Sequence, residues 1–188
     1  MLPVIAELLL TLACCIAAWL ALREQQGWRA LGFVSMGVAA FLGALEYGGA
    51  TVLVEPHHLA SVLSGAVGLP LIALGRLSGA SVQRALVLLA CMALVMLPSQ
   101  VTLLTNLVAL LVIAWPGRSR RHLLALLGAL LFIGSGLLIG TRGELAGVPR
   151  RELFHLGLTL AVVVWMLAGL GSGVPRLPGG WAVRRKAP

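Results

Sequence analysis

The chain has 188 residues, of which 60% are hydrophobic and 11% are charged, and its mean hydropathy is +1.01. Soluble domains have about a quarter charged residues, so this composition excludes an ordinary water-soluble fold, and its high hydrophobicity excludes disorder. The net charge of +8 comes from basic residues that flank apolar segments. Basic residues in these positions set the orientation of a protein in the membrane, so the charge does not indicate a nucleic-acid partner.

Seven apolar segments, each nearly free of charge, follow one another along the chain. A membrane-spanning helix needs about 20 apolar residues, so seven spans use most of the chain and leave only short loops. In chain order the predicted spans are Leu2–Leu22, Ala30–Val54, Leu59–Leu74, Ala85–Leu97, Val101–Trp115, Leu123–Gly140 and Leu153–Gly171. The sequence therefore predicts an all-α, polytopic membrane bundle of seven transmembrane helices over residues 1–175. A basic cytoplasmic tail follows over residues 176–188.

The fourth and fifth spans are short, but Ala85–Trp115 as one helix would be about 46 Å long, which is too long for a single crossing. Pro98 with Ser99 and Gln100 lies at its middle and predicts a turn. Two spans here place eleven of the 14 Lys and Arg residues on one side, whereas one span divides them equally. The positive-inside rule thus favours seven crossings, with the N-terminus outside and the C-terminus in the cytoplasm. The Ala-, Leu-, Gly-, Val- and Arg-rich composition favours a bacterial cytoplasmic (inner) membrane.

Ionisable residues within the spans gather in the half that faces outward. Such groups are costly in a membrane, so they are candidates for function. Glu7 lies one to two turns into the first span, Glu46 roughly 13 Å from the outer end of the second, and His155 about one turn into the seventh. His57 and His58 precede the third span and are either loop residues or part of the same site. This asymmetry predicts a polar cavity that opens to the outside.

Carboxylates and imidazoles are the ligands that zinc prefers, with one position left for water when the site is catalytic. Glu46, His155 and one of His57 or His58 could supply three ligands from three helices. We therefore predict Glu46, His57 and His155 as catalytic residues, and Glu46, His57, His58 and His155 as candidate zinc ligands. Retinal is excluded, because the only lysine is Lys186 in the tail and none lies in the seventh span.

Leu42, Glu46, His57 and the run His155-x-x-x-Thr159 have the spacing of a known motif. This spacing and the seven-helix topology resemble the superfamily of alkaline ceramidases and progestin/adiponectin receptors. Its motif has a Ser four residues before a His in the second helix, an Asp about eleven residues after that His, and H-x-x-x-H in the seventh helix. His155 matches in type, while Glu46 stands in place of a His and His57 in place of the Asp. The resemblance implies zinc binding and hydrolysis of lipid amides.

Three functions are compatible with these residues. The first is an outward-facing, metal-dependent hydrolase of lipid amides or esters, with membrane lipids as partners and a lipid as substrate. The second is a non-catalytic membrane subunit or sensor, which implies a membrane-protein partner. The third is a small-solute or proton-coupled transporter with Glu46 as its protonatable group. It ranks last, because the sequence shows no internal repeat of the kind that transporters carry.

Overall fold

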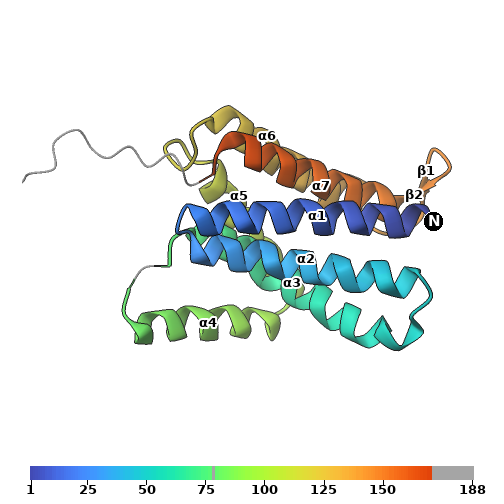
Figure 1. Cartoon of the computed structure of the whole chain (residues 1–188), viewed down its shortest axis with the longest axis horizontal. Coiled ribbons are helices and arrows are strands. Elements are labelled where there is room, and N and C mark those ends of the chain that lie inside the picture. Colours follow the sequence, from blue (N-terminus) through green and yellow to red (C-terminus); the bar gives the residue numbers. More distant parts are fainter. Residues whose placement is uncertain (78, 171–188) are drawn as a thin grey trace, which may run out of the picture.

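The computed structural model describes residues 1–77 and 79–170, and in these residues seven α-helices form a bundle (Figure 1). They are α1 (Leu2–Arg23), α2 (Gly27–Tyr47), α3 (Val54–Leu74), α4 (Ser81–Val95), α5 (Ser99–Ala114), α6 (His122–Ile133) and α7 (Arg150–Ala168). A 3₁₀ helix, Thr51–Leu53, precedes α3, and a π-helical segment, η2 (Gly134–Ile139), extends α6. The prediction of an all-α fold is confirmed. The predicted basic tail, residues 176–188, lies outside the described residues.

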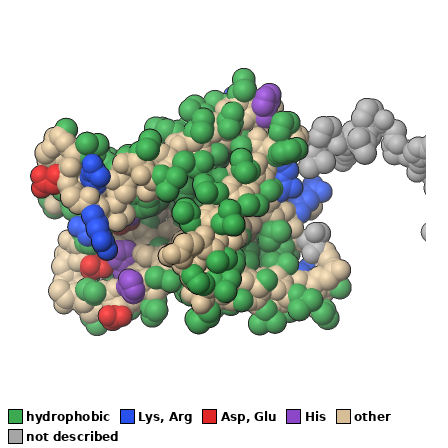
Figure 2. Space-filling view, turned by 180° about the vertical axis from the view of Figure 1, so that it is seen from behind, with side chains coloured by type: hydrophobic (Ala, Val, Ile, Leu, Met, Phe, Trp, Pro, Cys, Tyr) green, Lys and Arg blue, Asp and Glu red, His purple; other side chains and the backbone are tan. Residues whose placement is uncertain are grey.

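Five of the helical segments are long and apolar enough to cross a membrane: Leu2–Arg23, Gly27–Tyr47, Thr51–Leu74, His122–Ile139 and Arg150–Ala168. Large apolar side chains such as Leu12, Leu104 and Leu123 are exposed on the sides of the bundle, which is the reverse of a soluble protein. Figure 2 shows hydrophobic side chains over the middle of one face. Acidic side chains lie at one end of that face together with basic and histidine side chains, and further basic side chains and a histidine lie at the other end. The chain is a multi-pass membrane protein.

The helices α4 and α5 are shorter than the five candidate membrane-spanning segments. They have 15 and 16 residues, or about 22 and 24 Å, against a hydrocarbon layer of about 30 Å. The break between them falls at Pro98, as the sequence predicts, and Figure 1 shows that α4 accompanies only part of the length of the bundle. Seven crossings with the N-terminus outside stay a prediction.

A hydrogen bond fixes the position of α5 along α3. The side-chain amide of Asn106 donates to the carbonyl of Gly65 over 2.7 Å. Asn106 lies seven residues after the start of α5, whereas Gly65 lies eleven residues after the start of α3. At about 1.5 Å per residue, α5 therefore begins about 6 Å short of the corresponding end of α3.

The segment between α2 and α3 differs from the prediction. The second span was expected to continue to Val54, but α2 ends at Tyr47, because Gly48 and Gly49 follow and Gly49 adopts a φ of +109°. Glu46 is therefore in the last turn of α2, and its expected depth of roughly 13 Å is wrong. The third helix begins at Val54 rather than Leu59, since a proline such as Pro56 is tolerated in the first turn.

Small residues let the central helices approach closely. α1 packs against α2 and α7, α2 against α3, and α6 against α7. A Cβ atom on Gly32 of α2 would lie 2.6 Å from the carbonyl oxygen of Gly68 of α3, so the two backbones are in direct contact there. Trp165 of α7 is fully buried, stacks on Phe132 at 5.6 Å and donates its indole N–H to the carbonyl of Ala125. The core is thus dense in the half of the bundle where α2 and α6 begin and α3 and α7 end.

Candidate functional site

A cavity of about 510 Å³ lies among α1, α2, α3, α5, α6, η2 and α7. Most of its wall is apolar: Leu10, Met36, Leu69, Leu103, Leu107, Leu110, Phe132, Ile133, Leu137, Phe154 and Leu158. Its ionisable side chains and its tyrosine come from the helix ends at one end of the bundle: Glu7, Tyr47, His57, Arg151 and His155. An apolar hollow with a few converging polar groups is the usual form of a small-molecule site.

The first polar feature is a pair between Glu46 and His57. His57 Nδ1 lies 2.6 Å from Glu46 Oε2. The side chain of His57 is 14% exposed and that of Glu46 is 21% exposed. The sharp turn after Tyr47 brings the last turn of α2 beside the first turn of α3, which is why residues eleven positions apart meet. Because Nδ1 faces the carboxylate, Nε2 is the ring nitrogen that remains for another partner. The ring of Tyr47 meets the His57 ring edge-on at 5.7 Å.

The second polar feature is a pair between Glu7 and His155. His155 Nδ1 lies 3.1 Å from Glu7 Oε1, and the Glu7 side chain is only 1% exposed. The approach is not aligned as a hydrogen bond, and neither carboxylate oxygen of Glu7 has a hydrogen-bond partner in the part of the chain that the structure describes. A buried carboxylate in this condition is costly to the fold. Glu7 is therefore a candidate site residue.

Gly43 of α2 lets the two pairs come together. A Cβ atom at this position would lie 2.8 Å from Glu7 Oε1 and 3.0 Å from His57 Nε2, so these two atoms are at most 5.8 Å apart. Glu7, Glu46, His57 and His155 thus form one cluster, contributed by α1, α2, α3 and α7. We call these four residues the four-residue cluster.

Replacing Gly43 by alanine is expected to destabilise the protein by about 1 kcal/mol, because the new methyl group displaces the buried Glu7 carboxylate. This figure is the net of an overpacking cost of about 2 kcal/mol and a gain in helix propensity of at most about 1 kcal/mol. Thermal unfolding in detergent measures the effect. Adding Glu7→Ala to Gly43→Ala should restore stability, since it removes the contact; if the double variant is no more stable than Gly43→Ala, the contact is not the cause.

Arg151 closes the rim of the cavity against Tyr47. Its guanidinium lies 4.4 Å from the centre of the Tyr47 ring and donates to the tyrosine hydroxyl over 3.2 Å. This contact joins the first turn of α7 to the end of α2. Arg151 is the one Lys or Arg that lines the cavity within the described residues, so it is the cation available to a negatively charged or polarised ligand there.

Two other predicted positions lie outside the cluster. His58 is exposed and does not line the cavity. Thr159, at the position of a second histidine in the motif, donates its hydroxyl to the carbonyl of His155 within its own helix. The structure therefore brings together Glu46, His57 and His155 of the predicted set, adds Glu7, and leaves His58 apart.

The cluster does not fit a zinc centre as it lies here. Within the described residues, no group of three or more His, Cys, Asp or Glu is placed to hold a metal ion. Glu46 and His57 instead face each other, and so do Glu7 and His155. Zinc binding by Glu46, His57, His58 and His155 stays a prediction, which elemental analysis of the purified protein tests, and no reaction step below depends on a metal.

Comparison of the chain with protein-family models, curated proteins and solved structures gives no match. The resemblance to the alkaline ceramidases and progestin/adiponectin receptors thus depends on the sequence spacing and the predicted topology.

Proposed function

We propose that the protein binds an amphipathic lipid in this cavity and hydrolyses an amide or ester bond near its polar head. The observation that carries the proposal is the position of the four-residue cluster at one end of a cavity whose other walls are apolar. A hydrocarbon chain matches the apolar wall, and a polar head matches the cluster. The proposal includes the sequence-based orientation, in which this end faces outward from a bacterial cytoplasmic membrane.

In the proposed reaction, His57 acts as the general base. Glu46 accepts a hydrogen bond from Nδ1–H of His57 and orients the ring, so that Nε2 can take a proton from a water molecule. The water oxygen forms a bond to the carbonyl carbon, and the carbon–nitrogen or carbon–oxygen bond then breaks. The proton on Nε2 passes to the departing nitrogen or oxygen. Arg151 can stabilise the negative charge that develops on the carbonyl oxygen.

The test is a turnover assay with the purified protein in detergent micelles and long-chain amide and ester substrates. His57→Asn is expected to lower turnover at least about 100-fold, since a positioned general base contributes about that much or more. His58→Asn is the matched control, because His58 is the neighbouring histidine and is exposed outside the cavity. It should keep the activity of the original protein.

Two outcomes would count against this function. Equal turnover in His57→Asn and the original protein would remove His57 from the reaction. Lipid binding without turnover would reject hydrolysis and favour the non-catalytic sensor or subunit, which would use the same cavity for recognition alone.

A further inference from the structure

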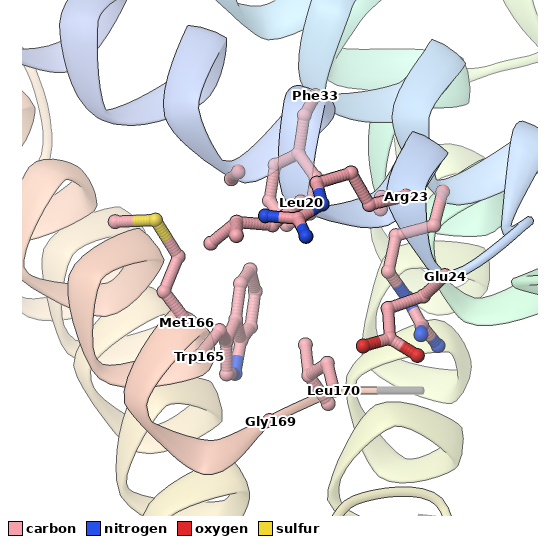
Figure 3. Close-up of a pocket in the computed structure, with 11 residues that line it drawn as sticks. Leu20, Arg23, Glu24, Phe33, Trp165, Met166, Gly169 and Leu170 are labelled. Atoms are coloured by element: carbon pink, nitrogen blue, oxygen red, sulfur yellow. The ribbon is translucent and has the colours of Figure 1, made fainter. Parts of the chain in front are cut away.

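A second cavity, of about 380 Å³, lies at the opposite end of the bundle, where α1 and α7 end. Figure 3 shows Trp165 and Met166 of α7 facing Leu20 and Arg23 of α1 across this cavity. Apolar side chains form most of the wall. The charged side chains that line it are Arg23, Glu24 and Arg29.

Arg29 is the unusual residue of this cavity, because it is only 3% exposed. Its Nε donates to the carbonyl of Ile72 over 3.1 Å, and another of its nitrogens donates to the side-chain oxygen of Gln26. Both acceptors are neutral. A buried guanidinium normally has a carboxylate or another anion beside it, since its charge is otherwise poorly compensated.

The described residues do not supply that anion. Glu24 is the single acidic residue of the wall, and neither Arg23 nor Arg29 forms an ion pair with it or with another carboxylate in residues 1–77 and 79–170. Arg118 adds positive charge beside Arg29. It donates to the carbonyl of Ala73, the residue after the Ile72 whose carbonyl Arg29 binds. The buried Nε of Arg118 has no hydrogen-bond partner among the described residues. The remaining sequence, residues 171–188, contains no Asp or Glu.

We propose that this cavity binds the phosphate headgroup of an anionic membrane phospholipid. The planar guanidinium groups of Arg23 and Arg29 match the geometry of a phosphate, and Arg23 is held at the rim by stacking on Trp19 at 4.9 Å. The apolar wall at Trp165 and Met166 accommodates the start of an acyl chain, which favours a lipid over a free anion. This site is separate from the proposed hydrolytic cavity, because it lies at the other end of α1 and α7.

The test is lipid binding by the full-length, delipidated protein in a neutral detergent, followed by native mass spectrometry. The probes are phosphatidylglycerol, phosphatidylcholine and inorganic phosphate. Phosphatidylglycerol should bind most tightly, and Arg23→Gln should weaken its binding about tenfold, the usual size of one lost charge-assisted hydrogen bond. Met166→Trp, which fills the cavity without changing its charge, should also weaken binding.

Arg84→Gln is the control for nonspecific electrostatic attraction between the anionic lipid and the basic protein surface. Arg84 is an exposed arginine at the start of α4 and does not line the cavity. It should bind phosphatidylglycerol as the original protein does. Equal weakening by Arg84→Gln would overturn the proposal in favour of diffuse attraction to the basic surface. Equally tight binding of phosphatidylcholine would exclude selection by charge, and equally tight binding of inorganic phosphate would assign the site to a free anion.

Discussion

His155→Leu is expected to lower the free energy of unfolding by about 1–3 kcal/mol, because it leaves the buried Glu7 carboxyl group without its polar neighbour. Glu7 is 1% exposed, and His155 is the one residue within the described chain that pairs with it. The leucine preserves apolar volume, so the loss reports the broken pair rather than a large hole. Thermal or denaturant unfolding of the purified protein in detergent measures it.

The double variant Glu7→Leu/His155→Leu should recover the stability that His155→Leu loses, since replacing both members of a buried polar pair by apolar residues of similar shape costs little. The same double variant should be inactive in the turnover assay if the cluster binds the polar head. His58→Leu is the control and should be neutral, because His58 is exposed. A His155→Leu protein as stable as the original would show that Glu7 is accommodated without His155, for example by holding a proton.

Gly32→Ala is expected to cost about 1–3 kcal/mol of stability, which is the usual penalty for overpacking a core. Its Cβ would lie 2.6 Å from the carbonyl oxygen of Gly68 and 2.8 Å from Cγ1 of Ile72, both in α3. A side chain could rotate away, but the backbone of Gly68 cannot, so α2 and α3 must separate. This loss outweighs the gain of at most about 1 kcal/mol from replacing a helical glycine.

Gly65→Ala provides the matched comparison within α3. A Cβ at Gly65 has nothing within 4 Å, so this variant should be as stable as the original protein or slightly more stable. Unfolding of both variants under the same detergent conditions gives the difference. If Gly32→Ala is as stable as Gly65→Ala, the close contact between α2 and α3 does not limit stability.

Hydropathy predicted the helices well but misplaced the boundary between the second and the third. Charge-free apolar segments correspond to α1 to α7, and Pro98 correctly marked the break between α4 and α5. The segment from Gly48 to Val54 is nearly as apolar as the helix before it, so a hydropathy pattern continued the second span to Val54. Hydropathy reports the preferred solvent of a segment, whereas the positive φ of Gly49 decides where the backbone turns.

The candidate site was predictable in its residue types but not in its pairing. Glu46, His57 and His155 stood out because ionisable groups are rare in apolar segments. Their pairing depends on the turn after Tyr47, which brings Glu46 to His57, and on α1, which brings Glu7 to His155. Helical periodicity could have indicated that Glu7 is buried. It lies three residues before Leu10 and seven before Cys14, so the three residues share one helix face, and Leu10 and Cys14 are buried.

The short helix α5 has a consequence for how a substrate reaches the cluster. Because α5 begins about 6 Å short of the start of α3, it leaves the first turns of α3 uncovered, and the exposed Ser61 there borders the larger cavity. In the proposed function, a lipid would enter the cavity laterally from its membrane leaflet, while its acyl chain stays in contact with the acyl chains of other lipids. Its supply is a two-dimensional diffusion problem, so the rate of the proposed reaction would follow the mole fraction of substrate in the membrane and not its concentration in water.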